Sequence, residues 1–176
     1  GTSSDFTLTG ASNGDNMARV DLFIGGQNKG TFYYGDANVA EYTIENVSHG
    51  TGNQKVELKV TADDGTWDAF IDKLTISGQS AGGNTSGGNN SGNTDNNGGN
   101  TGNNNNNNNT GNNNGGAVSN NSSMECEDMT KSGQYTGNVS SPFDGVALYA
   151  NDDCVSYTQN FASGTHDFTL RGASNG

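Results

Sequence analysis

The sequence predicts an all-β protein built as an antiparallel β-sandwich. Short segments alternate apolar and polar residues, as strands with one buried face do. Turn signals rich in Gly, Asn and Asp separate these segments at regular spacing, which is typical of sandwiches. No stretch has the 3.6-residue period of an amphipathic helix, so helical folds are excluded.

Nine strands are expected. Six lie in the first part of the chain and three in the second, and neither group completes a sandwich alone, whereas together they do. In chain order the predicted strands cover residues 5–10, 18–26, 29–35, 40–47, 54–62, 67–77, 123–129, 146–150 and 154–161.

Between the two groups, residues 79–121 consist almost only of Asn, Gly, Ser and Thr, and contain no aromatic residue. Such a segment cannot bury enough apolar surface to offset its ordering entropy, so a disordered linker is expected. It divides the chain into two foldable segments, 1–78 and 122–176. A flexible linker of this length spans about 35 Å, roughly the width of a small domain.

An internal repeat gives the relation between the two segments. DFTLTGASNG at residues 5–14 recurs as DFTLRGASNG at residues 167–176. The long offset fits one module plus one linker, so 1–78 reads as the C-terminal part of one copy and 122–176 as the N-terminal part of a second. Either the segments close on each other as a circular permutant, which makes one copy of the repeat surplus, or they belong to neighbouring modules of a tandem array.

The chain is strongly acidic, with a formal net charge of −12. This balance argues against a nucleic acid or an anionic membrane as partner, and suits cations, neutral ligands and an extracellular location. No run of 18 apolar residues predicts a membrane span. Cys126 and Cys154 form either a disulfide, as in a secreted protein, or two buried thiols.

The stretch ADDGTWDAFID, residues 62–72, crowds four aspartates around the only tryptophan. Like charges this close repel one another, and a bound cation would resolve the conflict. Asp68 and Asp72 lie about 13 Å apart along a strand. One ion with metal–oxygen bonds of about 2.4 Å cannot contact both, so cations require two sites.

The first candidate site is the loop itself. Asp63, Asp64 and Asp68, with backbone carbonyls of residues 65–67, offer hard oxygen ligands that suit Ca²⁺ better than zinc. The spacing is not that of an EF-hand. The alternative is a solvated acidic turn without an ion.

The second candidate site combines Asp72 with Glu125 and Glu127. Strand alternation places Asp72 on the same face as apolar residues of its strand, so it needs a partner. Glu125 and Glu127 are two apart in a predicted strand and share one face, while Cys126 points the other way. The alternative is an exposed edge strand that carries two acids.

Two tyrosines lie in or near turns, Tyr135 in GQYTGN and Tyr149 in VALYAND. Sugar-binding sites use aromatic faces with nearby polar groups, so both are candidates for glycan contact. The alternative is that each is a partly buried strand residue.

Paired carboxylates could also serve as the acid and base of a glycosidase, but the acids lie in one turn, and His49 and His166 have no catalytic partners. We therefore expect no enzyme activity.

These residues resemble carbohydrate-binding module family 36. ECEDMTKSGQYTGNVSSPFDGVALYANDDCVSYTQNF is similar to the front half of that family, and GASNGDNMARVDLFIGG through TADDGTWDAFIDKLTI to the back half. The halves occur here in reversed order. Family 60, which looks like a circular permutant of family 36, is similar in this respect.

The resemblance implies a β-jelly-roll found beside xylanase domains in secreted bacterial enzymes. It implies a non-catalytic, calcium-dependent xylan-binding module with two Ca²⁺ ions, which targets an attached glycoside hydrolase to plant cell wall. The alternative is a calcium-stabilised structural or adhesive repeat without xylan affinity. The implied ligands are Asp63, Asp68 and the Trp67 carbonyl at the glycan-site ion, with Asp64 in the same motif, and Glu125, Glu127 and Asp72 at a structural ion; Tyr135, Tyr149, Trp67, Asp63 and Asp68 would contact xylan or xylo-oligosaccharide.

Overall fold

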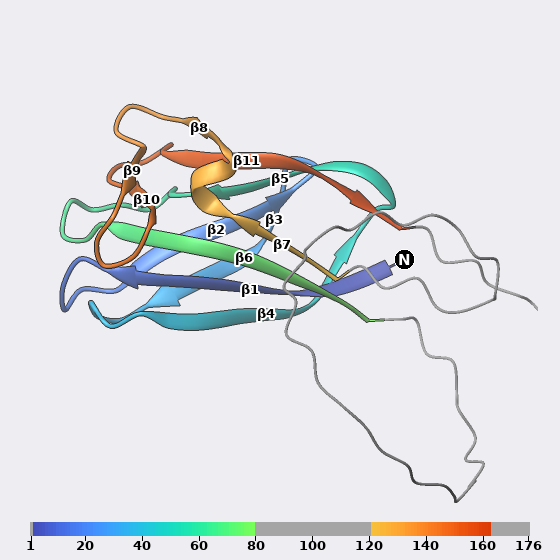
Figure 1. Ribbon diagram of the computed structural model, residues 1–176, viewed down its shortest axis with the longest axis horizontal. Coiled ribbons are helices and arrows are strands. Elements are labelled where there is room, and N and C mark those ends of the chain that lie inside the picture. The colour runs from blue at the N-terminus through green and yellow to red at the C-terminus, as the bar shows by residue number, and fades with distance from the viewer. Residues whose placement is uncertain (1, 80–120, 163–176) are drawn as a thin grey trace, which may run out of the picture.

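The computed structural model describes residues 2–79 and 121–162. Nearly all of the linker predicted over 79–121, the second copy of the repeat at 167–176 and His166 lie outside the described residues. The described part consists of two antiparallel sheets packed face to face (Figure 1). The predicted all-β sandwich is confirmed.

One sheet has the strand order β4-β1-β6-β10-β9, with β7 also paired to β6, and the other has the order β3-β2-β5-β11-β8. The strands β8 and β9 and one short helix were not predicted, because three residues are too few to show a period. The elements are β1 (Thr2–Ser12), β2 (Ala18–Ile24), β3 (Gln27–Tyr34), β4 (Ala40–His49), β5 (Gly52–Lys59), β6 (Ala69–Gln79), β7 (Ser122–Glu125), η1 (Cys126–Asp128), β8 (Thr130–Ser132), β9 (Gly137–Val139), β10 (Gly145–Leu148) and β11 (Cys154–Phe161).

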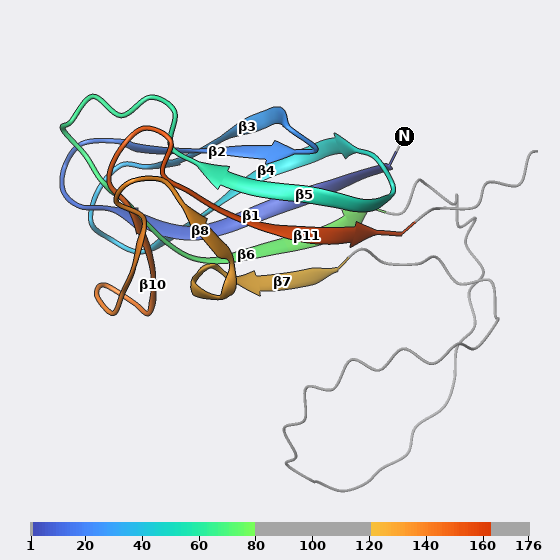
Figure 2. The same cartoon turned by 90° about the horizontal axis from the view of Figure 1, so that it is seen from above.

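Both sheets are built from both segments of the chain. In one sheet, β6 pairs with β7 and β10; in the other, β5 pairs with β11 over the full length of both strands, from Lys59 opposite Cys154 to Gly52 opposite Phe161. Figure 2 shows β11 beside β5 and β7 beside β6. The permuted closure of the two segments within one chain is therefore present in the structure.

The core lies between the sheets and also draws on both segments. Phe6 of β1 and Phe161 of β11 are almost fully buried, and their ring centroids lie 6.3 Å apart. His49 stacks on Phe161 at 4.0 Å and binds the Ser4 hydroxyl at 2.8 Å, so this histidine is a satisfied core residue. Burial of these rings is a major contribution to holding the segments together.

A bulge in β6 corrects the predicted position of Asp72. The register with β1 shifts between Leu8, opposite Leu74, and Gly10, opposite Ile71, so Asp72 and Lys73 together face one residue of β1. The bulge reverses the alternation of faces. Ile71 and Leu74 are both buried, and the prediction that Asp72 shares a face with Leu74 was wrong.

A second correction concerns residues 123–129, where one continuous strand was predicted. The strand β7 ends at Glu125, and a 3-10 helix carries Cys126 and Glu127.

Cys126 and Cys154 are both buried free thiols, which decides between the disulfide and the two buried thiols in favour of the thiols. Among the described residues no helix is long and apolar enough to cross a membrane.

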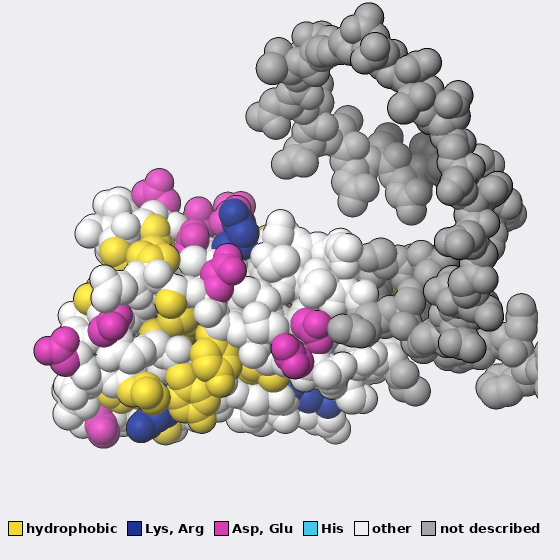
Figure 3. Space-filling view, turned by 90° about the horizontal axis from the view of Figure 1, so that it is seen from below, with side chains coloured by type: hydrophobic (Ala, Val, Ile, Leu, Met, Phe, Trp, Pro, Cys, Tyr) yellow, Lys and Arg dark blue, Asp and Glu magenta, His cyan; other side chains and the backbone are white. Residues whose placement is uncertain are grey.

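The strands β3 and β4 are edge strands of the two sheets, and they contact each other on one side of the sandwich. Tyr42 packs edge-on against the buried ring of Phe32 at 6.2 Å, and Tyr33 lies 5.7 Å from Tyr42. Hydrophobic side chains gather on the side of the molecule where β4 lies (Figure 3). Both tyrosines remain part-exposed, and Tyr42 covers the buried Phe32 at this edge.

Candidate functional site

The acidic loop between β5 and β6 is held in its conformation by hydrogen bonds within the loop. The Asp63 carboxylate accepts from Gly65 N at 2.7 Å, and Gly65 adopts a φ of +80° that favours glycine. The Asp64 carboxylate accepts from the hydroxyl and the N–H of Thr66 at 2.6 and 3.0 Å, and these bonds lower the pKa of Asp64. The loop conformation is therefore set by the aspartates themselves.

The turn between β1 and β2 braces this loop from one side. Asn13 donates from its side chain to Asp68 Oδ2 at 2.7 Å and from its main chain to Asp68 O at 3.1 Å. Asn16 donates to the carbonyl of Thr66 at 2.8 Å. One carboxylate oxygen of Asp68 is thus held by Asn13, and this bond orients the other.

Asp63 and Asp68 lie close enough to influence each other. Partial burial is the main cause that raises the pKa of Asp68, the Asn13 hydrogen bond opposes it, and the Asp63 carboxylate raises it further. A divalent cation between the two carboxylates would remove this repulsion. Among the described residues, however, Asp63, Asp64 and Asp68 do not form a set of three carboxylates whose oxygens all lie within 4.8 Å of one another, so the predicted ion site in this loop stays a prediction.

The position of Trp67 corrects one predicted role. Its side chain is only 3% exposed and belongs to the core cluster. A buried indole has no face to offer to a sugar ring, so contact through the ring is excluded in this structure. Only the main chain of Trp67 lies in the loop, where its carbonyl remains a candidate ligand.

Tyr135 and Tyr149 are exposed, as glycan-contacting residues need to be. Tyr135, in the turn between β8 and β9, is 54% exposed, and Tyr149, just after β10, is 41% exposed. Tyr149 also packs edge-on against Phe70 of β6, with ring centroids 6.5 Å apart, which limits its movement. The alternative that both are partly buried strand residues is not what the structure contains.

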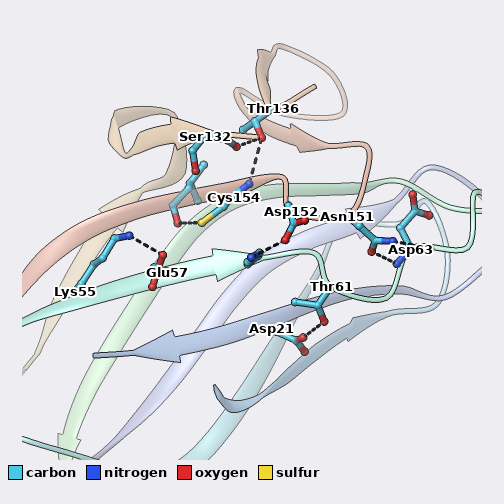
Figure 4. A network of polar contacts seen from close by, with 12 residues as sticks. Asp21, Lys55, Glu57, Thr61, Asp63, Ser132, Thr136, Asn151, Asp152 and Cys154 are labelled. Carbon is cyan, nitrogen blue, oxygen red and sulfur yellow. Dashed lines mark hydrogen bonds and ion pairs between the residues drawn. The ribbon is translucent and has the colours of Figure 1, made fainter. Parts of the chain in front are cut away.

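The turn that follows Tyr149 is bonded directly to the acidic loop, although they come from different segments. The Asn151 side chain accepts from Asp63 N at 2.7 Å and donates to Asp63 O at 3.1 Å (Figure 4). Next to it, Asp152 N donates to Val60 O at 2.8 Å. Closure of the two segments therefore brings the turn of Tyr149 to the candidate cation loop.

The second predicted cluster also assembles. Carboxylate oxygens of Asp72, Glu125 and Glu127 lie within 4.8 Å of one another. Two oxygens bound to one Ca²⁺ at about 2.4 Å are at most about 4.8 Å apart, so this spacing fits the ion. Glu127 Oε2 is buried and has no hydrogen-bond partner within the described part of the chain, and a buried carboxylate oxygen of this kind suits a cation ligand.

The fold explains how these three acids meet. Along one edge of β6 the partner changes from β10, opposite residues 69–71, to β7, opposite residues 73–76, and Asp72 lies at the break. Partial burial, and then the Glu125 carboxylate, raise the pKa of Asp72. Lys73 pairs with Glu125 at 2.8 Å and offsets part of the negative charge.

Sequence reasoning missed the residues that brace the site. Asn13, Asn16 and Asn151 each bond to a main-chain or carboxylate group of the acidic loop, and none was predicted. Their only signal was a polar turn, as in SNGDN at residues 12–16 and NDD at residues 151–153. Such turns are too common to be assigned a partner without the fold.

Two curated relatives match part of this chain. A bifunctional xylanase/deacetylase of Pseudobutyrivibrio xylanivorans is 76% identical over 68 residues, which are 39% of this chain and 11% of the relative. An arabinoxylan arabinofuranohydrolase of Paenibacillus polymyxa is 40% identical over 73 residues, which are 42% of this chain and 12% of the relative. The chain thus spans about a tenth of the length of these relatives. No family model matches it.

Several solved structures that are similar to this chain are carbohydrate-binding modules, two of them with clear sequence identity. A CBM36-1 domain of a multidomain xylanase from the hindgut metagenome of Trinervitermes trinervoides is 69% identical, with a TM-score of 0.42, and the match covers 43% of this chain and 60% of that one. A CBM36 in complex with calcium and xylotriose is 37% identical, with a TM-score of 0.42 and coverage of 43% and 64%. A circularly permuted module, vCBM60, is 14% identical, with a TM-score of 0.43 and coverage of 93% and 96%.

These matches show which class of protein this chain resembles in sequence. The chain is similar in sequence to carbohydrate-binding modules, which are non-catalytic domains, and the expectation that it is not an enzyme agrees with them. More particularly, the predicted resemblance to carbohydrate-binding module family 36 is confirmed by the sequence identities of 69% and 37% to CBM36 domains over 43% of this chain.

Proposed function

We propose that this chain is a calcium-dependent carbohydrate-binding module that binds xylan or xylo-oligosaccharides. The observation that carries the proposal is the pair of hydrogen bonds between Asn151 and Asp63, which joins the turn of the exposed Tyr149 to the acidic loop. A CBM36 of related sequence was solved with calcium and xylotriose, which supports the same ligands here.

In this proposal Asp63, Asp68 and the Trp67 carbonyl hold the ion at the glycan surface, with Asp64 oriented beside them. A bound Ca²⁺ supplies coordination positions that two adjacent sugar hydroxyls can fill in place of water. Asn13 and Asn16 keep the loop in place, so little loop entropy is lost on binding. Tyr135 and Tyr149 offer apolar ring faces to the sugar.

We further propose a second, structural Ca²⁺ held by Asp72, Glu125 and Glu127. Asp72 comes from the first segment of the chain, and the two glutamates come from the second. An ion at this cluster would therefore stabilise the closure of the two segments on each other. It would also relieve the repulsion among three carboxylates.

The attached catalytic domain and the secreted location belong to the same proposal. The curated relatives are named as a xylanase/deacetylase and an arabinoxylan arabinofuranohydrolase, and this chain matches only about a tenth of each. A binding module joined to such an enzyme would hold it on plant cell wall and raise its effective concentration at the substrate.

Isothermal titration with xylotriose, in saturating Ca²⁺ and again in EDTA, tests the proposal. We expect binding only when Ca²⁺ is present. Binding that persists unchanged in EDTA would remove the ion from the mechanism. Release of reducing sugar from xylan by the chain alone would contradict a non-catalytic role.

The Asp72, Glu125 and Glu127 cluster favours one second candidate, a calcium-stabilised structural or adhesive module without xylan affinity. This cluster bridges the segments and does not need a glycan to explain it. In that case Ca²⁺ raises the melting temperature, but no xylo-oligosaccharide raises it further. A further rise with xylotriose at saturating Ca²⁺ separates the two functions.

A further inference from the structure

Asp153 is a fully buried acidic residue that the predicted site does not include. Its side chain is 0% exposed, and it lies between the turn of Tyr149 and the start of β11. Its Oδ1 accepts a hydrogen bond from Tyr135 N at 3.0 Å, and its Oδ2 accepts from Tyr149 N at 2.9 Å and from Ala150 N at 3.2 Å. One carboxylate therefore holds the main chains of both exposed tyrosines.

We infer that Asp153 is a positioning residue for glycan binding, because its carboxylate fixes the spacing between Tyr135 and Tyr149. The inference rests on the proposed function, in which these two rings flank the sugar. Asp153 itself does not touch the ligand. It acts through the two turns that it joins.

The bonding pattern distinguishes this role from that of an ordinary turn aspartate. Hydrogen bonds to Tyr149 and Ala150, four and three residues away, would suffice to stabilise the local turn. The bond to Tyr135 N crosses 18 residues and reaches a turn between two other strands. Burial of a charge is costly unless hydrogen bonds compensate it, and three N–H donors supply that compensation here.

Gly133 shows that the turn of Tyr135 is built around this carboxylate. A Cβ atom at Gly133 would clash with Asp153 Oδ1 and would lie only 2.5 Å from Asp153 Cα. Gly133 also has a φ of +102°, which other residues rarely adopt. Only glycine lets the turn approach Asp153 so closely, and Tyr135 follows two residues later.

The main chain of Asp153 relates the tyrosines to the acidic loop. Its carbonyl accepts from Val60 N at 3.0 Å, and Val60 comes directly before that loop. The hydrogen bonds of the carboxylate go to the two tyrosine turns and not to the aspartates of the loop. Loss of the carboxylate should therefore disturb the spacing of the rings while the cation ligands stay in place.

The first test compares Asp153→Asn with Asp152→Asn. An amide at position 153 has one acceptor oxygen, so either the Tyr135 turn or the Tyr149 turn loses its bond. Asp152 is the matched control, since it is exposed, pairs with Lys59 at 2.7 Å on the surface, and has a φ of +74° that asparagine tolerates. At saturating Ca²⁺ we expect Asp153→Asn to weaken xylotriose binding about tenfold, and Asp152→Asn to leave it unchanged.

The distinguishing readout is Ca²⁺ affinity measured without sugar, by titration of the same variants. We expect Asp153→Asn to keep it within about twofold of the native value. An equal loss of Ca²⁺ and xylotriose affinity would mean that Asp153 merely supports the fold, and native xylotriose affinity in the variant would also overturn the inference. If the native chain binds Ca²⁺ but not xylotriose, the proposed function fails, and the inference fails with it.

Gly133→Ala provides a second route if Asp153→Asn does not fold. The added Cβ pushes against the carboxylate from the side of Tyr135 and leaves the acid itself intact. Amide resonances in a nitrogen-15-labelled sample report both turns directly. We expect the Tyr135 and Tyr149 amides to shift together in Gly133→Ala; a shift of Tyr135 alone would show that Asp153 does not couple the two rings.

Discussion

The Asn151 side chain hydrogen-bonds both main-chain groups of Asp63, with Oδ1 2.7 Å from Asp63 N and Nδ2 3.1 Å from Asp63 O. The two residues are 88 positions apart in sequence and belong to different segments of the chain. An amide side chain bonded in this way acts like one residue of a neighbouring strand. The acidic loop therefore depends on the second segment for its place in the fold.

Asn151→Ala should separate the acidic loop from the tyrosine turn. Two hydrogen bonds are lost and the main chain of Asp63 becomes free to move, so we expect xylotriose affinity at saturating Ca²⁺ to fall about tenfold. Isothermal titration measures this change. Asn38→Ala, in the exposed turn between β3 and β4, is the control and should bind as the native chain does; native affinity in Asn151→Ala would show that the contact is dispensable.

Asp68→Ala should abolish calcium-dependent glycan binding with little effect on stability measured in EDTA. Asp68 is partly exposed and lies directly before β6, outside the core. Removal of one carboxylate takes away a charged ligand of the glycan-site ion and frees Asn13. Retention on insoluble xylan is the measurement, with Asp36→Ala as the control. A melting temperature in EDTA that falls by more than a few degrees would point to a structural role for Asp68 instead.

Glu127→Gln should remove most of the stabilisation that Ca²⁺ provides. The buried Oε2 of Glu127 has no partner in the described part of the chain, and a neutral amide is a weaker ligand than a carboxylate. In the native chain, Ca²⁺ at about 100 times its dissociation constant should stabilise the fold by about 2.7 kcal/mol. Thermal unfolding with Ca²⁺ and with EDTA measures the difference. An equal calcium shift in Glu127→Gln and the native chain would remove this site from the account.

The two-layer fold was predictable because its long strands keep a clean alternation of apolar and polar residues. The same alternation failed at Asp72, because a bulge adds a residue to one strand without changing the local pattern. It failed again at Glu127, where a short helix follows β7. The carboxylates of Asp72, Glu125 and Glu127 nevertheless lie together. They meet because the neighbour of β6 changes from β10 to β7 at Asp72, and not because they share one strand face, as the prediction assumed.

The acidic residues of the candidate loop could be predicted from the sequence, but the residues that hold the loop in place could not. Four aspartates around one tryptophan are visible in any reading of the sequence. The asparagines that hold the loop, Asn13 and Asn151, are 55 and 88 residues from their partners. Nothing local marks such long-range bonds. The burial of Trp67 was equally hidden, because an aromatic residue beside charges suggests a surface position as readily as a core one.

Stability should respond to pH in opposite directions with and without calcium. Burial and neighbouring carboxylates raise the pKa of Asp68 and Asp72 above the ordinary value of 3.8. A group whose pKa is raised by folding stabilises the fold below its ordinary pKa, and this contribution is lost as pH rises through the raised value. In EDTA, these two groups therefore favour the folded state at acid pH.

Bound Ca²⁺ reverses the direction of this pH dependence of stability, because its carboxylate ligands must be ionised. The rise in melting temperature that Ca²⁺ causes should grow between about pH 4 and pH 7. Scanning calorimetry in Ca²⁺ and in EDTA at each pH measures the rise. Asp72→Asn should flatten its pH dependence, whereas Asp36→Asn, an exposed control, should not. A calcium effect of constant size over this range would contradict the assignment.

Cleavage of the chain between residues 80 and 120 should leave the module assembled and active. The contacts that join the segments are the pairing of β5 with β11, the pairing of β6 with β7 and β10, and the packing of Phe6 on Phe161. None of these contacts involves the residues between the segments. A protease site placed in that stretch gives two fragments, which should elute as one species on gel filtration and bind xylotriose with native affinity in Ca²⁺.

Phe161→Ala tests the association of the two fragments in a less stable variant. Truncation of this buried ring costs about 3–5 kcal/mol, a large fraction of the stability of a small domain. In the intact chain the linker keeps the segments at high effective concentration, so the variant should still fold at low temperature. After cleavage that advantage is lost, and the fragments of the variant should separate while those of the native chain stay together. Native fragments that separate on cleavage would show that closure depends on the covalent link, and that in a longer protein each segment is free to pair with a neighbouring module.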